Sequence, residues 1–188
     1  MQGYLAALTL VLLAALVAFR VWWLKRSGIR AMNFGRIDKS DFLLPPFALF
    51  YFYTICAAAF DLPAVSAQRF WRSDAVAWLG VLLCGLGVGC LLGSLISFGR
   101  SFRVGIDNEH PDKLVTTGVF AYSRNPIYVG FIALLLGQFL VFPNWILLVY
   151  LLAGTWLINR QVLREEAFLG QHYGAQYAEY CRRVRRYV

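Results

Sequence analysis

Charged residues are scarce in this sequence, and those present are confined to a few segments. Only 15% of the 188 residues are Asp, Glu, Lys or Arg, whereas 60% are hydrophobic. Residues 42–60 and 75–99 carry no charge, and residues 4–24 carry only Arg20. A soluble domain of this length needs far more polar surface to cover its core. The scarcity excludes an ordinary soluble fold and predicts an integral membrane protein.

Histidine and cysteine are also too few, or too dispersed, for the centres that they usually build. The two histidines, His110 and His172, lie outside the apolar runs, which argues against a haem or histidine-rich metal centre in the membrane. The four cysteines form no C-x-x-C pair, which argues against a disulfide framework and a thiolate metal site. We therefore expect no metal. Without a charge inside 42–60 or 75–98, an ion or proton pathway is not expected either.

The apolar runs predict an all-α integral membrane protein with five transmembrane helices. We expect these helices at residues 4–24, 42–60, 75–98, 126–142 and 145–160, because about 20 apolar residues span a bilayer as a helix. The last two are short and are separated by the turn-forming Pro143 and Asn144, so they are expected to form a helical hairpin. No internal repeat is present, which favours a single domain over residues 1–188.

Two smaller patterns concern helix packing. Gly85, Gly89 and Gly93 recur every fourth residue, and such a stripe lets a neighbouring helix approach closely, although glycine is also simply common in membrane helices. After the last apolar run, hydrophobic and tyrosine residues recur at helical intervals opposite arginines, which predicts a C-terminal helix at the membrane interface. The members of this stripe are Val162, Leu169, Tyr173, Tyr177, Tyr180 and Val184.

The formal net charge of +8 is placed in a way that predicts topology rather than nucleic-acid binding. Basic residues concentrate between the first and second runs, between the third and fourth, and after the fifth. By the positive-inside rule these segments and the C-terminus are cytoplasmic, and the N-terminus is outside. The excess charge also favours anionic lipid headgroups. No basic segment precedes the first run, which favours a retained helix over a cleaved signal peptide.

A first polar cluster precedes the fourth apolar run, in "LVTTGVFAYSRNPIYVG". Gly118 allows a turn or a close backbone approach, and Pro126 suits the first turn of a helix with Asn125 as its cap. Free amides at that helix start, together with Arg124, favour an anionic ligand, and Tyr128 offers a ring for stacking. A capped helix start with an interfacial arginine explains the same residues equally well.

A second polar cluster, Glu165 and Glu166, follows the fifth run. Both acids are expected to lean toward the apolar face of their helix, which is costly unless something binds them. A carboxylate there can accept the hydroxyls of a ribose or pair with an ammonium group; a solvated pair bridged to Arg160 or Arg164 is the alternative. Because a hairpin returns to its starting side, the two clusters should meet on one face, which suits a nucleotide-like cofactor.

These two segments resemble the signatures of one family. "LVTTGVFAYSRNPIYVG" is similar to the central motif of the isoprenylcysteine carboxyl methyltransferase and phospholipid methyltransferase superfamily, and "REEAFLGQHYGAQYAEYCRRV" resembles its second motif. The resemblance covers about residues 98–184 and includes the intervening hairpin. It implies a membrane-embedded methyltransferase that uses S-adenosylmethionine, with 98–184 as the cofactor-binding catalytic core. Residues 1–75 match no motif of the family and are expected, from their apolar runs, to form two further helices with a basic connection.

The resemblance also implies roles for individual residues. Arg124 would orient the cofactor or an acidic substrate group, and Glu166 would be the nearest base if the acceptor were an amine. Arg160 and Gln161 fall near a substrate-contacting arginine of the prenylcysteine enzymes. Phe120 stands where the family usually has tyrosine, and Asn125 replaces the histidine of the eukaryotic enzymes. The positions matching cofactor-contacting residues are Lys113, Leu114, Val115, Gly118, Phe120, Asn125, Pro126, Ile127, Tyr128 and Glu165.

The methyl acceptor is left open by these patterns. We expect in-line transfer to a lipophilic small molecule or lipid delivered from the bilayer, with a prenylcysteine-type carboxylate, a phospholipid amine and a small thiol as the alternatives. A carboxylate needs no general base, whereas an amine does. A non-catalytic membrane scaffold or lipid-binding subunit that keeps the same fold is the alternative from another class of function.

Overall fold

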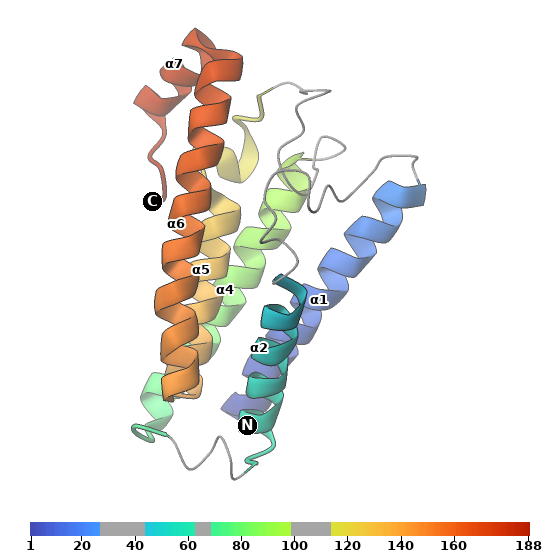
Figure 1. The fold of residues 1–188 in the computed structure, drawn as a ribbon, viewed down its shortest axis with the longest axis vertical. Helices are drawn as coiled ribbons and strands as arrows, with labels where there is room; N and C mark the ends of the chain where they lie inside the picture. The colour runs from blue at the N-terminus through green and yellow to red at the C-terminus, as the bar shows by residue number, and fades with distance from the viewer. Residues whose placement is uncertain (27–43, 63–68, 99–113) are drawn as a thin grey trace.

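In the computed structural model the chain folds entirely into helices joined by loops, over the residues that the structure describes: 1–26, 44–62, 69–98 and 114–188. Within these ranges there is no strand, in agreement with the predicted all-α class (Figure 1). In chain order the helices are α1 (Gln2–Arg26), α2 (Leu44–Ala59), α4 (Asp74–Phe98), the short 3-10 helix η3 (Gly118–Ala121), α5 (Pro126–Val141), α6 (Trp145–Tyr173) and α7 (Ala175–Arg183).

Three of these helices are long and apolar enough to cross a membrane: Gln2–Trp23, Asp74–Phe98 and Trp145–Tyr173. Two further helices, Pro46–Ala59 and Pro126–Val141, are apolar but shorter. Large hydrophobic side chains such as Leu82, Ile96 and Leu152 are exposed on the outside of the bundle. An outer surface of this kind is expected where lipid rather than water surrounds the helices.

The predicted helix start at 42 lies outside the described residues; of the other nine predicted ends, eight agree with the structure to within two residues. The exception is the fifth helix, which was expected to end at 160 and instead runs without a break to Tyr173. The apolar run ends near 160, but backbone hydrogen bonding continues through the polar residues that follow. The stripe predicted from Val162 to Val184 is divided between the end of α6 and α7, which are separated at Gly174, where φ is +50°.

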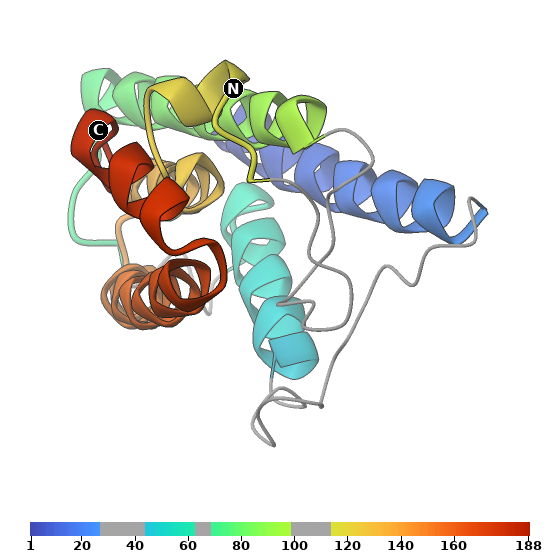
Figure 2. The ribbon, with the colours of Figure 1, turned by 90° about the horizontal axis from the view of Figure 1, so that it is seen from above.

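Helices α4 and α5 pack along a seam of glycines spaced seven residues apart, and the two helices lie side by side in both views (Figures 1 and 2). A Cβ added at Gly137 would lie 2.6 Å from the Gly80 oxygen, and one at Gly87 would lie 2.7 Å from the Gly130 oxygen. The two backbones therefore approach so closely that no side chain fits between them. We call Gly80, Gly87, Gly130 and Gly137 the glycine seam.

The glycines that the sequence singled out for close packing are different ones, and that prediction was largely wrong. A Cβ on Gly85 or Gly89 would meet nothing within 4 Å, so these glycines face outward. Only Gly93 is in close contact, with the Val119 side chain. Gly85 and Gly89, four residues apart, lie on one face of α4. Helix α5 packs on a different face, which carries Gly80 and Gly87, seven residues apart.

The connection between α5 and α6 is a tight polar turn, as Pro143 and Asn144 predict. The Asn144 side chain is fully buried and its Oδ1 accepts a hydrogen bond of 2.9 Å from the Leu147 amide, which caps α6. Because α5 and α6 run in opposite directions from this turn, the start of α5 lies beside the later part of α6 (Figure 1). The two polar clusters are thereby brought to the same end of the bundle.

Candidate functional site

The turn that leads into α5 is anchored to the end of α4. Gly118 has φ of +65°, and a Cβ there would clash with the Ser97 hydroxyl. The Val119 amide donates to Ser97 Oγ at 3.3 Å, and the Phe120 ring is buried in an edge contact with Phe98, at 4.6 Å between centroids. These contacts fix where the following Arg124 and Asn125 lie.

Helix α7 supports this turn from the other side. The Tyr180 hydroxyl donates to the Phe120 carbonyl at 2.7 Å. Burial raises the pKa of Tyr180 to about 12, so the hydroxyl keeps its proton and can donate this hydrogen bond well into the alkaline range. The tyrosines of the predicted C-terminal stripe therefore face inward, since Tyr177 and Tyr180 are both buried.

Asn125 occupies the N-cap position of α5 and precedes Pro126, as predicted, but its side chain does not cap the helix. Its amide Nδ2 instead donates to Glu166 Oε1 at 3.2 Å and to the carbonyl of Arg186 at 3.1 Å. The Asn125 side chain thus joins the start of α5 to α6 and to the C-terminal residues.

Glu166 is surrounded by donors. Arg124 Nη2 lies 3.4 Å from its Oε1, Arg186 Nε lies 2.9 Å from its Oε2, and the Asn125 amide donates to Oε1. The side chains of Arg124 and Glu166 are only 13% and 11% exposed, so this ion pair is largely withdrawn from solvent. A charge buried this far requires such partners. Arg124 also donates to the Cys181 sulfur.

Glu165 has a separate set of partners. Its Oε1 accepts hydrogen bonds from the Tyr128 hydroxyl at 2.5 Å and from Gln161 Nε2 at 3.0 Å. Tyr128 comes from α5, so this contact is a second link between α5 and α6. The adjacent carboxylates therefore differ: Glu166 is paired with two guanidinium groups, and Glu165 with two neutral donors.

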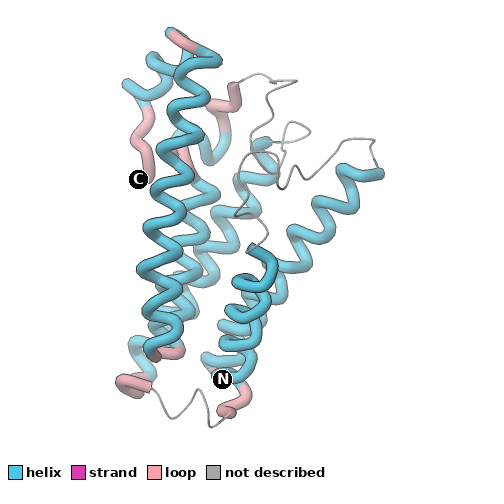
Figure 3. Tube along the Cα trace, viewed as in Figure 1, coloured by secondary structure: helices cyan, strands magenta, loops and turns pink. Residues whose placement is uncertain are grey.

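The C-terminal residues also contact this site, which the sequence did not predict. Residues 184–188, here called the C-terminal strap, follow α7 and return along α6 (Figure 3). The Arg185 carbonyl accepts from the Arg124 amide at 3.0 Å, and the Tyr187 hydroxyl donates to Asn159 Oδ1 at 2.7 Å. The sequence showed only a basic cluster here, because backbone-carbonyl contacts leave no side-chain signature and the partners of Arg186 and Tyr187 lie 20 or more residues away in the chain.

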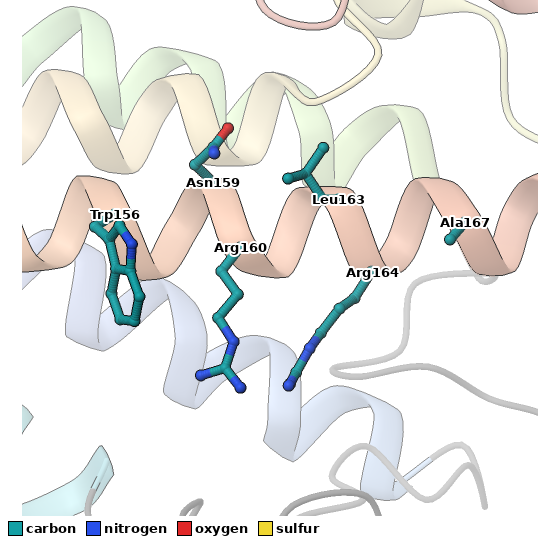
Figure 4. A pocket seen from close by; sticks show the side chains of 6 residues that line it. All are labelled: Trp156, Asn159, Arg160, Leu163, Arg164 and Ala167. Carbon is teal, nitrogen blue, oxygen red and sulfur yellow. The ribbon is translucent and has the colours of Figure 1, made fainter.

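An open groove of about 470 Å³ lies along α6; among its lining residues, Asn159 bonds to Tyr187 of the C-terminal strap. Trp156, Arg160 and Arg164 extend to the same side of the helix, away from Asn159 and Leu163 (Figure 4). The Arg160 guanidinium lies 6.0 Å from the centre of the Trp156 ring. The lining side chains are those of Trp156, Asn159, Arg160, Leu163, Arg164 and Ala167.

The remaining predicted site residues are divided between the site and its surroundings. Leu114 and Val115 are half-buried at the start of the last described segment, and Lys113 lies outside the described residues. Pro126 is buried, and Ile127 packs against the apolar cluster of Cys84, Leu91 and Leu134. Arg160 lines the groove, whereas the Gln161 side chain bonds to Glu165. These two residues, both predicted to contact the substrate, therefore lie in different parts of the structure.

The donor set indicates which kind of ligand the site fits. Within the described residues, the buried Nε–H of Arg124 has no hydrogen-bond partner, and an unsatisfied buried donor costs about 1–3 kcal/mol. A ligand oxygen would satisfy it. In the part of the chain that the structure describes, no cluster of three or more His, Cys, Asp or Glu residues is placed to hold a metal. The site therefore offers a cation, two carboxylates, amides and aromatic rings.

Comparison with known proteins identifies similar chains. The sequence profile of a family described as phospholipid methyltransferase matches residues 75–176. Protein-S-isoprenylcysteine O-methyltransferase B of Arabidopsis thaliana is 32% identical over 120 residues, covering 62% of this chain and 59% of that protein. The Homo sapiens protein-S-isoprenylcysteine O-methyltransferase is 30% identical over 139 residues, covering 70% and 49%. The chain thus spans about half to three fifths of the length of these relatives.

Proposed function

Because this chain belongs to the phospholipid methyltransferase family, we propose that it is a membrane methyltransferase that uses S-adenosylmethionine and methylates a lipophilic acceptor. The observation that carries this proposal is the meeting of two motifs: Arg124, Asn125 and Tyr128 at the start of α5 contact Glu165 and Glu166 of α6. A non-catalytic scaffold has no need for a buried acid pair held in this way.

The residues present fit the cofactor. S-adenosylmethionine, when bound, supplies a methyl group activated by the sulfonium. Glu165 is suited to accept ribose hydroxyls or to pair with the ammonium group, and the unsatisfied Nε–H of Arg124 is suited to the carboxylate. Asn125, Pro126 and Tyr128 would form one wall, with Phe120, Leu114 and Val115 as further expected contacts; Lys113, also expected to contact the cofactor, lies outside the described residues. Gly118 shapes the turn that carries them.

The surroundings of Glu166 favour an acceptor that needs no general base. Both of its oxygens are engaged by Arg124, Asn125 and Arg186, so this carboxylate would have to release a donor before it could take a proton. An acceptor carboxylate would need no such help, because it is already ionised and nucleophilic: bonding of its oxygen to the activated methyl group would be matched by loss of the methyl–sulfur bond, and no proton would have to move. Phospholipid amines and small thiols are the second choice.

The groove on α6 is our candidate for the acceptor's path from the bilayer. Trp156 and Leu163 give it apolar walls, and Arg160 offers a cation for an acidic group, with Gln161 one position further on beside Glu165. Two of the relatives, from Arabidopsis thaliana and Homo sapiens, are named as isoprenylcysteine O-methyltransferases. We therefore propose a prenylcysteine-type carboxylate as the acceptor class.

We further propose five membrane crossings, with α5 and the first part of α6 as a hairpin. Support comes from the five apolar helices and from the basic residues at one end of the bundle. Lys25 and Arg26 end α1 at the same end that carries α7 with Arg182 and Arg183 (Figure 1). The positive-inside rule assigns this end, and the site with it, to the cytoplasm, and the N-terminus to the outside.

The test is a titration of the purified, detergent-solubilised protein with S-adenosylmethionine, comparing Glu165→Gln with Glu179→Gln. Glu179 is an exposed glutamate of α7 that pairs with Arg182 and Arg183, so it controls for the loss of one negative charge. We expect saturable binding that weakens about tenfold or more in Glu165→Gln and is unchanged in Glu179→Gln. Absence of saturable binding by the unaltered protein would favour the scaffold alternative.

The acceptor class is tested by transfer of labelled methyl to three probes: an S-farnesylcysteine derivative with a free carboxylate, phosphatidylethanolamine vesicles and a hydrophobic small thiol. We expect label in the first, released as methanol by mild base because it is an ester. Label in the lipid amine or the thiol, with none in the carboxylate, would contradict the proposed acceptor while leaving the methyltransferase assignment intact.

A further inference from the structure

The C-terminal strap contacts both halves of the proposed site. The side chain of Arg186 reaches Glu166 on α6, and its backbone carbonyl accepts hydrogen bonds from Asn125 Nδ2 at 3.1 Å and from Ser123 Oγ at 3.4 Å, both at the start of α5. The preceding carbonyl, that of Arg185, accepts from the Arg124 amide. One short segment therefore bridges the turn and the acid pair. The family match ends at residue 176, before this segment.

The contacts of the strap that join it to α5 and α6 are polar. Arg185, Arg186 and Val188 are exposed, so the strap buries little apolar surface and adds little to the packing of the helices. The helices are already joined by the glycine seam and by the turn at Asn144. What the strap contributes is the orientation of a few polar groups: Glu166, Asn125 and Arg124.

Glu166 is the group most dependent on the strap. Of its three donors, Arg124 and Asn125 both approach Oε1, whereas the contact to Oε2 comes from Arg186 at 2.9 Å. Without Arg186 the carboxylate would be free to rotate about its last side-chain bond. Arg124 and Asn125, whose side chains are oriented by Oε1, would then lose their fixed partner.

We propose that Arg186 is a positioning residue of the cofactor site, a proposal that rests on the proposed methyltransferase function. It holds Glu166 so that the Arg124–Asn125 turn keeps the geometry that binds S-adenosylmethionine. Arg186 itself does not touch the reacting atoms. Its effect is therefore expected in the affinity for the cofactor and in KM for the cofactor, more than in kcat at saturation.

The test compares Arg186→Gln, Arg186→Lys and the control Arg182→Gln, an exposed arginine of α7 that pairs with Glu179. We expect Arg186→Gln to raise Kd and KM for S-adenosylmethionine about tenfold. Lysine should restore part of the affinity by keeping the charge, and Arg182→Gln should match the unaltered protein. Absence of saturable binding by the unaltered protein would refute the proposed function itself, whereas saturable binding that Arg186→Gln leaves unchanged would refute only the role of Arg186.

A double-variant cycle separates positioning from general destabilisation. If Arg186 acts through Glu166, then Arg186→Gln should weaken cofactor binding by less than about twofold when Glu166→Gln is already present. The proposal is overturned if Arg186→Gln binds the cofactor as Arg182→Gln does, or if its effect is undiminished in the Glu166→Gln background. It is also overturned if the loss of affinity follows a fall in Tm that lysine does not reverse.

Discussion

Two regions hold helix α5 in place, and they do so by different physics. The glycine seam joins α5 to α4 inside the apolar part of the bundle, where backbone approaches backbone and shape alone decides the fit. The polar cluster joins the start of α5 to α6 and to the C-terminal strap through charged and amide groups, among which Asn125, Glu166 and Arg186 are each in contact with the others.

The polar cluster should depend on the glycine seam, whereas the seam should not depend on the polar cluster. Helix α5 carries Gly130 and Gly137 on the side facing α4, and Tyr128 on the side facing Glu165 of α6. A defect in the seam would displace the whole helix, and the polar contacts with it. A defect in the polar cluster would leave the seam intact and alter ligand binding alone.

The largest effect should follow from breaking the seam with Gly137→Val. The added Cβ would meet the Gly80 oxygen and the Cys84 sulfur, both at 2.6 Å, and backbone atoms cannot move aside cheaply. We expect a loss of about 3 kcal/mol, or a fall in Tm of roughly 6–12 °C, with cofactor binding lost in proportion. Thermal unfolding in detergent measures it.

The control for the seam is Gly85→Val. Gly85 lies on α4, on a face of that helix where an added Cβ meets nothing within 4 Å. The control variant should shift Tm by much less than Gly137→Val. Equal shifts for the two variants would mean that helix propensity, and not the close approach of α4 and α5, explains the loss.

An intermediate effect, confined to the site, is expected for Asn125→Asp. This change keeps the shape of the side chain but removes the amide donor to Glu166 and the Arg186 carbonyl, and it places a carboxylate against them. Cofactor affinity should fall about tenfold or more, while Tm falls less than in Gly137→Val. Isothermal titration together with thermal unfolding separates the two quantities.

Asn159→Asp is the matched control for that change. Asn159 accepts a hydrogen bond from the Tyr187 hydroxyl through Oδ1, and an aspartate accepts it equally well. Cofactor affinity should therefore be unaltered. If both substitutions weakened binding alike, the added negative charge, and not the lost amide donor, would be responsible.

The smallest effect is expected for Gln138→Leu, within the apolar part of the bundle. Gln138 is fully buried, and its Nε2 donates to the Ala6 carbonyl at 2.8 Å and to Thr9 Oγ1 at 3.3 Å, joining α5 to α1. Hydrogen bonds between membrane helices contribute about 0.6 kcal/mol on average, and leucine fills a similar volume. Tm should fall by about 1–2 °C, without a change in cofactor affinity; a larger fall than in Gly137→Val would reverse the ranking.

The helices were predictable from the sequence because long apolar runs are typical of helices in lipid. The starts of α5 and α6 were predictable because Pro126 favours the first turn of a helix and Asn144 favours the N-cap position. The meeting of Arg124, Asn125 and Tyr128 with Glu165 and Glu166 was also predictable, since a hairpin must return its ends to one side. Hydropathy does not report which face of a uniformly apolar helix packs inward. Gly85 and Gly89 were therefore chosen in place of Gly80 and Gly87.

Two features of the site had no signal in the sequence. Asn125 stands in a typical cap position before a proline, so the sequence predicts that its side chain caps the helix. In the structure its amide instead bonds to Glu166 and to the Arg186 carbonyl, which are distant in the sequence. The strap contacts the site partly through backbone carbonyls, which every residue has, and partly through Arg186, which in the sequence is one of several clustered arginines and so looked like a topology signal alone. Both features depend on contacts between residues about 20 to 60 positions apart in the chain.

The most direct measurement is the dissociation constant of S-adenosylmethionine for the unaltered protein, Glu165→Gln and Glu179→Gln in the same detergent. A cofactor site built from the two polar clusters predicts saturable binding, weakened about tenfold or more by the change at Glu165 and unaffected by the change at Glu179. Saturable binding that is indifferent to the change at Glu165 would contradict a cofactor site at this place in the fold.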